Sequence, residues 1–144
     1  MKPLSPEGRE KLEGLLKLEE GVKLFCYQDT TGNNTIGIGR NLSAKGIRMS
    51  EALLMLDNDI NEAITELTNN LSLYLQLDDI RKIVLIDMTF EMGIHGLLSF
   101  KNMLSLLEAG KYEDASKDML NSLWAKQVPS RAQKLSYMIE TGIM

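Results

Sequence analysis

Three side chains near the N-terminus have the types and spacing that acid–base chemistry on a sugar requires. Glu20 is followed after eight residues by Asp29, and Asp29 after five residues by Thr35. In glycoside hydrolysis, a protonated carboxyl group donates its proton to the leaving oxygen, and a second polar group manages an oxocarbenium-like centre or its attacking water. We therefore take Glu20 as the candidate acid and Asp29 and Thr35 as its partners.

A helix end and a β-hairpin must position these side chains. Glu20 directly precedes Gly21, a residue that readily closes a helix because it adopts the left-handed conformation without a Cβ penalty. The next segments are LFCYQD and TIGIG, which alternate in polarity on either side of a turn-rich TTGNN. This pattern predicts a hairpin whose turn is supplied by Gly32 and Asn33.

The same three residues also fit a structure without catalysis. Carboxylates and threonines near a turn are common in a solvated loop, where the aspartate makes an Asx-type cap with the backbone. The spacing of the three residues alone does not separate this alternative from a catalytic site.

The residues around the three side chains are more specific than the spacing. EEG, YQDTTG and TIGIGRNL resemble the active-site signature of the T-even-type phage lysozymes, the muramidases of glycoside hydrolase family 24. A second run, from Trp124 to Ala132, resembles the W-x-x-Q-x-P-x-R-A motif that precedes the last helix of this family. The resemblance implies an α+β, mainly α, lysozyme-like fold with two lobes, a small β-hairpin lobe and a larger helical lobe.

The resemblance also implies an activity. The expected reaction is hydrolysis of the β-1,4 bond between N-acetylmuramic acid and N-acetylglucosamine in bacterial peptidoglycan, in the setting of phage host lysis. Glu20 would donate the proton, Asp29 would stabilise positive character at the sugar or orient the nucleophile, and Thr35 would position the attacking water. The expected partner is therefore the peptidoglycan glycan strand, and no cofactor is called for.

Further residues are expected to bind substrate or to support these three. By resemblance, Arg131 pairs with Glu20, and Glu91 stands where the family has an amide that contacts substrate; the remaining two supporting residues are Gln127 and Arg40. Arg131 would favour the charged form of Glu20, whereas burial would favour the neutral acid, as would Glu91 unless it points to solvent. Arg40 replaces a histidine of the best-known member, and its guanidinium suits a fork-shaped ion pair with an acid such as Asp59. Asp87 interrupts an apolar helix, either as a core acid held by hydrogen bonds or as a catalytic group.

Composition limits the class of protein. The 144 residues suit one domain, and 44% hydrophobic with 25% charged residues is ordinary for a globular chain. A net charge of −4 argues against a nucleic-acid partner. It also requires a local positive surface if long-range attraction to an anionic wall is to operate. We expect a monomer.

Other sequence features concern metals, membranes and export. His95 is the only histidine, which excludes a histidine metal cluster, and we expect it in a loop before Gly96. The single Cys26 excludes an intrachain disulfide, and its apolar neighbours predict that it is buried. No stretch is long enough to insert in a membrane, and the charged N-terminal segment differs from a secretory signal peptide. We therefore expect synthesis in the host bacterial cytoplasm and action on the cell wall after release.

The expected organisation is a single lysozyme domain, residues 1–144. Its parts are a hairpin lobe at about 21–48, a linking helix at about 49–68, and a helical lobe at about 69–144 that includes the N-terminal helix. That N-terminal helix should begin at Ser5-Pro6. Arg48 is a poor N-cap for the linking helix, so its start is expected to be weakened or shifted to Ser50. A central apolar helix should run from Asp78 to Gly93.

Two rival functions fit the same fold. A peptidoglycan-binding or effector module that has lost turnover would need a damaged set of catalytic residues, and all three are present here. A lytic transglycosylase would use a single glutamate and make an anhydro product, so that Asp29 and Thr35 would be dispensable.

Overall fold

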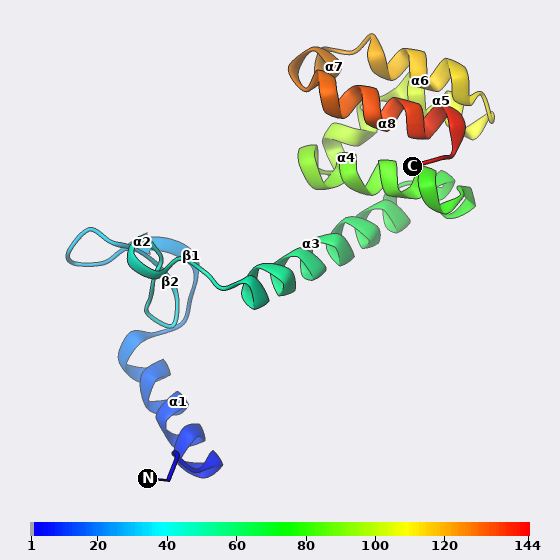
Figure 1. Cartoon of the computed structure of the whole chain (residues 1–144). Coiled ribbons are helices and arrows are strands. Elements are labelled where there is room, and N and C mark those ends of the chain that lie inside the picture. Colours follow the sequence, from blue (N-terminus) through cyan, green and yellow to red (C-terminus); the bar gives the residue numbers. More distant parts are fainter. Residues whose placement is uncertain (1) are drawn as a thin grey trace. The chain divides into compact units, whose positions relative to one another are not determined.

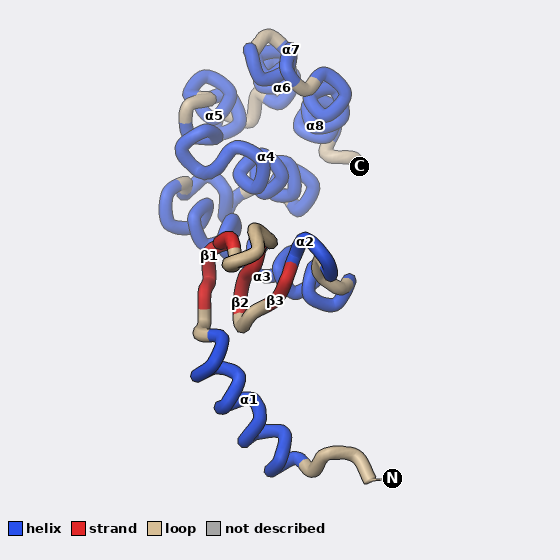
Figure 2. The backbone as a smooth tube through the Cα atoms, turned by 90° about the vertical axis from the view of Figure 1, so that its left-hand side faces the viewer, coloured by secondary structure: helices blue, strands red, loops and turns tan. Residues whose placement is uncertain are grey.

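The computed structural model describes residues 2–144, and it is mainly helical with one small antiparallel sheet (Figures 1 and 2). The helices are α1 (Pro6–Glu20), α2 (Leu42–Lys45), α3 (Met49–Asn70), α4 (Asp79–Leu98), α5 (Lys101–Glu108), α6 (Tyr112–Leu120), α7 (Leu123–Gln127) and α8 (Pro129–Thr141). A 3₁₀ helix spans Ser72–Gln76, and the strands are β1 (Lys23–Gln28), β2 (Asn34–Gly37) and β3 (Arg40–Asn41). The predicted α+β, mainly α class is confirmed.

The chain divides into two compact units. The first ends at Leu53 and contains α1, the sheet, α2 and the start of α3. The second spans Leu54–Met144 and contains the rest of α3 and the helices that follow. We call them the hairpin unit and the helical unit. The grouping of α1 with the helical lobe stays a prediction.

Helix α1 begins and ends where its sequence predicts. The Ser5 hydroxyl accepts a hydrogen bond from the Gly8 N–H at 3.0 Å, and Pro6 occupies the first turn. At the other end Gly21, with φ of +73°, donates its N–H to the Lys17 carbonyl at 3.0 Å. Both caps are local, since each joins residues three or four positions apart, and this is why sequence alone locates them.

The sheet has the order β1-β2-β3, with both pairs antiparallel. Tyr27 pairs with Thr35 in the predicted hairpin, and Thr35 pairs in turn with Asn41 of β3. The segment after the hairpin forms β3 and α2. Asn41 caps α2 by accepting a hydrogen bond from the Ala44 N–H at 3.0 Å.

The start of α3 is capped from within the helix. The Glu51 carboxylate accepts a hydrogen bond from the Arg48 N–H at 3.0 Å, which is the second half of a capping box. This bond satisfies the Arg48 N–H, although Arg48 itself lacks a side chain that favours the N-cap position. Helix α3 therefore begins at Met49 and is not shifted to Ser50.

Helix α4 is the centre of the helical unit. Asp78 caps its start by accepting from the Arg81 N–H at 3.2 Å, and helical geometry is interrupted at Gly93, with φ of +77°. Val84, Leu85 and Met88 are fully buried. Two apolar side chains of this helix remain exposed: Ile83 is 39% and Phe90 is 49% accessible.

The core of the helical unit is formed by residues from α3 to α8. Its largest fully buried side chains are Leu67, Leu85, Met88, Leu97, Met103, Leu107, Met119, Met138, Ile139 and Val84. Four of these ten are methionines, as expected for a side chain that fills irregular gaps. Within residues 2–144, no single helix is long and apolar enough to cross a membrane; α4 and α5 meet that criterion only together, as a pair bent by 98°.

Candidate active site

Glu20 is the last residue of α1, and its carboxylate lies against Gly39 in the turn between β2 and β3. A Cβ atom built on Gly39 would be 2.7 Å from Glu20 Oε2 and 2.9 Å from its Cδ. Gly39 also has φ of +71°, a conformation that side chains rarely adopt. The exposed acid at the exit of α1 thus lies beside the turn between β2 and β3.

Asp29 begins the turn between β1 and β2 and accepts four hydrogen bonds. Its Oδ1 accepts from the Thr31 N–H, the Thr31 hydroxyl and the Asn33 N–H, each at 2.9 Å. Its Oδ2 accepts from Asn33 Nδ2 at 3.2 Å. The Asn33 N–H is the largest cause of a lowered Asp29 pKa; burial is the second cause and opposes it, and the hydrogen bonds from Asn33 and Thr31 together outweigh burial. The Asx-type cap that the sequence left open is therefore present, and it keeps Asp29 ionised.

Thr35 lies in β2 and is 4% exposed. Its hydroxyl donates to the Asn33 carbonyl at 3.0 Å. Because the hydroxyl proton is engaged in this bond, the Thr35 oxygen can interact with a further group only as an acceptor. Asp29 and Thr35 are thus brought together around one residue, Asn33, which the sequence placed only in a turn.

Arg40 makes the predicted fork-shaped ion pair, but with a different acid. Its Nη1 and Nη2 contact Glu51 Oε1 and Oε2 at 3.1 and 3.0 Å, and Nη1 also donates to the Gly46 carbonyl at 3.2 Å. Glu51 lies in the first turn of α3, close in the chain to Arg40. The expected partner Asp59 lies two turns further along the same helix. Arg40 is the first cause of a lowered Glu51 pKa.

Arg131 joins two carboxylates within the helical unit. Its Nε contacts Asp87 Oδ1 at 2.9 Å, and its Nη1 contacts Glu91 Oε2 at 2.8 Å. Trp124 Nε1 donates to the other oxygen of Glu91 at 3.0 Å. Asp87 and Glu91 are therefore held by side chains of α7 and α8. The pairing of Arg131 with Glu20 stays a prediction.

The remaining residues predicted from the sequence lie apart from these networks. Gln127 is the exposed last residue of α7. His95 lies in the helical segment after Gly93, not in a loop. Cys26 is exposed, so the prediction of a buried thiol is wrong. It lies on β1, an edge strand, while α2 packs against β2 and β3.

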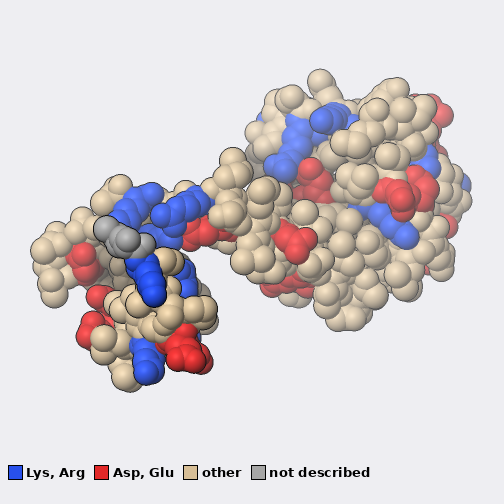
Figure 3. Space-filling model, turned by 60° about the horizontal axis from the view of Figure 1, so that its bottom comes forward, with Lys and Arg blue, Asp and Glu red and all other residues tan. Residues whose placement is uncertain are grey.

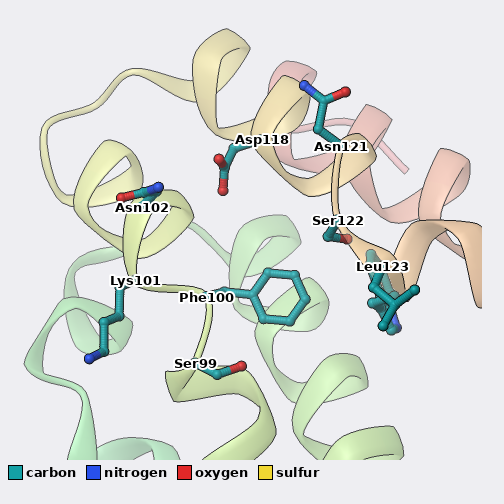
Figure 4. Close-up of a pocket in the computed structure, with 9 residues that line it drawn as sticks. Ser99, Phe100, Lys101, Asn102, Asp118, Asn121, Ser122 and Leu123 are labelled. Atoms are coloured by element: carbon teal, nitrogen blue, oxygen red, sulfur yellow. The ribbon is translucent and has the colours of Figure 1, made fainter.

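A hollow of about 600 Å³ opens in the helical unit between the start of α5 and the segment joining α6 to α7 (Figure 4). It is lined by Ser99, Phe100, Lys101, Asn102, Asp118, Asn121, Ser122, Leu123 and Trp124. The Phe100 ring meets that of Trp124 edge-on, with centroids 5.8 Å apart. None of the predicted catalytic residues lines this hollow.

The charges are unevenly distributed along the chain. Residues 21–48 contain four Lys or Arg and one Asp, whereas residues 54–144 contain eight Lys or Arg and thirteen Asp or Glu. Figure 3 shows both basic and acidic side chains on the visible face of the smaller body, which is the hairpin unit. The hairpin segment is therefore basic although the whole chain is acidic.

An acid at a helix exit, an ionised aspartate in a hairpin turn and a buried threonine in the next strand, within a mainly helical α+β chain, define a lysozyme-like glycoside hydrolase. The family model described as phage lysozyme matches residues 17–137. The chain belongs to the phage lysozyme family.

Three relatives extend this result. The probable T4-type lysozymes 1 and 2 of Dictyostelium discoideum are 35% and 32% identical, each over 92% of this chain and 95% of the relative. The pre-baseplate central spike protein Gp5 of Enterobacteria phage T4 is 27% identical over 89% of this chain and 27% of its own length. The similarity therefore covers most of this chain in each of the three.

Proposed function

We propose that the chain hydrolyses the β-1,4 bond between N-acetylmuramic acid and N-acetylglucosamine in bacterial peptidoglycan. Its biological setting, in this proposal, is the lysis of a phage host cell. The two lysozyme relatives come from Dictyostelium and the third from a phage, so the setting rests on the family and not on one relative.

In this reaction Glu20 donates its proton to the glycosidic oxygen as the bond from the sugar carbon breaks. A water molecule forms the new bond to that carbon and gives a proton to Asp29. Thr35 accepts a hydrogen bond from the same water. The products are two shorter glycans, one of which ends in reducing N-acetylmuramic acid.

One observation carries the proposal: the three side chains belong to one compact unit and have complementary environments. Glu20 is exposed beside Gly39, while Asp29 accepts four hydrogen bonds that favour its ionised form. A glycosidase needs two carboxyl groups in different environments, one of which acts as an ionised carboxylate.

The test is mass analysis of the fragments released from purified peptidoglycan. Reducing N-acetylmuramic ends support the proposal, and N-acetylglucosamine reducing ends would reassign the bond. Anhydro-muramic ends would identify a lytic transglycosylase. Binding to peptidoglycan without fragment release would favour the binding or effector module.

A further inference from the structure

Asn33 contacts both Asp29 and Thr35, although no catalytic role has been given to it so far. Its N–H donates to Asp29 Oδ1 and its Nδ2 to Asp29 Oδ2, at 2.9 and 3.2 Å. Its carbonyl accepts from the Thr35 hydroxyl at 3.0 Å. One residue thereby sets the orientation of the carboxylate and of the hydroxyl.

Thr31 completes the arrangement from the other side of the turn. Its N–H and its hydroxyl both donate to Asp29 Oδ1 at 2.9 Å, and its Oγ1 accepts from Asn33 Nδ2 at 2.8 Å. Both side chains therefore bond Asp29 and each other. A carboxylate bound in this way has few orientations open to it.

The two carboxylate oxygens of Asp29 differ in what they can still accept. Oδ1 receives three hydrogen bonds, whereas Oδ2 receives one, and that one is the longest of the four. Each carboxylate oxygen offers about two lone-pair sites. Oδ2 is therefore the oxygen with free capacity for a water molecule.

We propose that Thr31 and Asn33 are positioning residues of the active site, which orient Asp29 so that Oδ2 accepts the proton of the attacking water. This inference rests on the proposed function. Because the Thr35 hydroxyl donates its hydrogen bond to the Asn33 carbonyl, its oxygen can only accept a hydrogen bond from that water. A water that donates one proton to each acceptor presents its own lone pair to the sugar carbon.

The same hydrogen bonds set the pH range in which Asp29 can act. The charged groups of the three strands and α2 are Lys23, Arg40 and Lys45, and Glu20 lies at the end of α1. The donors that lower the Asp29 pKa are instead the uncharged Thr31 and Asn33. Removing a donor must raise this pKa, because hydrogen bonds to the ionised form are lost. The acidic limb of the activity profile would then move to higher pH.

The experiment measures kcat, KM and pH profiles for Thr31→Val and Asn33→Ala on peptidoglycan. Thr31→Val keeps the size of the side chain and removes the hydroxyl donor. For each variant we expect kcat to fall about tenfold to 100-fold, as for the loss of one hydrogen bond to a charged group, with KM nearly unchanged. The acidic limb of the pH profile should move to higher pH. Thr31→Ser should restore both kcat and the position of this limb.

Thr30→Val is the matched control. Thr30 lies in the same turn and is exposed, and no hydrogen bond from its side chain to Asp29 is present in residues 2–144. Its kcat and pH profile should equal those of the wild type. A carboxyl carbon NMR titration of Asp29 gives the pKa in each variant independently of turnover.

Two results would overturn the inference. One is an Asp29 titration and an acidic limb that do not move in folded Thr31→Val and Asn33→Ala. The other is a loss of activity that follows a loss of Tm and is not restored by Thr31→Ser, which is the behaviour of a merely structural contact. If the wild type itself released no reducing muramic ends, the proposed function would fail instead, and the NMR titration would still measure the positioning.

Discussion

The carboxylate of Glu20 rests against Gly39, so close that a Cβ atom on Gly39 would lie 2.7 Å from Oε2. The two residues are nineteen positions apart in the chain, one at the exit of α1 and the other in the turn before β3. The orientation of the proposed proton donor therefore depends on the absence of a side chain in that turn.

We expect Gly39→Ala to displace Glu20 and to lower kcat/KM by tenfold or more, since small misplacements of a reacting group cost about 100-fold. Gly37→Ala is the matched control, because Gly37 has the same conformation, φ of +72° against +71°, and has open space where the Cβ would be. Both variants should lose about 1–2 kcal/mol of stability from strain at positive φ. Equal activities in the two variants, at equal Tm, would rule out the contact as the cause.

Arg81 ties the end of α8 to the start of α4. Its Nε and Nη2 donate to the carbonyls of Ile139 and Glu140 at 2.7 and 3.1 Å, and its guanidinium carbon lies 3.5 Å from the Tyr112 ring centroid. We expect Arg81→Ala to cost on the order of 3 kcal/mol, because two carbonyls lose a charged donor in a nearly buried site. Arg81→Lys should recover only part of this, since an ammonium cannot reach both carbonyls and stack on the ring. Urea unfolding measures both, and a fully stable Arg81→Lys would show that charge alone suffices.

Asp78 should make the free energy of unfolding depend on pH. Burial raises its pKa, but the hydrogen bonds and charge of Arg81 outweigh this effect, so the pKa is lowered from 3.8. A carboxyl group with a lowered pKa in the folded state stabilises above its unfolded pKa, and this contribution is lost as pH falls through the folded value. We expect the free energy of unfolding to decline below about pH 4.

The check is urea unfolding between pH 2.5 and about 6. Asp78→Asn should be less stable than the wild type near neutral pH and should show a weaker decline in acid. Asp79→Asn is the control, since it removes a neighbouring carboxylate and leaves the Arg81 pair intact. Parallel declines in Asp78→Asn and the wild type would contradict the assignment.

The basic hairpin segment should attract the anionic wall, and this attraction should be screened by salt. We expect Lys45→Gln to raise KM for peptidoglycan at low ionic strength and to weaken the salt dependence of KM, with kcat unchanged. Lys111→Gln, an equal change of charge in the helical unit, should do neither. Identical salt dependence in the two variants would mean that the charge of the hairpin has no steering role.

Features with local causes were predictable from the sequence. The caps at Ser5 and Asp78 and the end of α1 at Gly21 each depend on residues three or four positions apart, and the structure has all three. The fork-shaped pair of Arg40 followed from the chemistry of guanidinium. Its partner did not, because Asp59 and Glu51 are both acids of α3 and only the path of the chain decides between them.

Other features depend on information that a short pattern does not carry. Strand β3 has two residues, too few to show alternation, and no pattern in the sequence indicates it. Cys26 alternates like a buried residue, but five of the six residues of β1 are exposed, so neither face of the strand is covered. The bonds from Thr31 and Asn33 to Asp29 were visible only as a turn-rich TTGNN, since side-chain geometry decides which oxygen each donor reaches.

The most direct measurement is the rate at which folded Glu20→Gln releases reducing ends from purified peptidoglycan, compared with Glu19→Gln. Both residues are exposed glutamates in the last turn of α1, so the two variants differ only in which carboxyl group is lost. We predict that Glu20→Gln is at least about 100-fold slower than the wild type, because no proton can be transferred to the leaving oxygen, and that Glu19→Gln keeps the wild-type rate. A well-folded Glu20→Gln with wild-type release would contradict the role of Glu20 as the acid.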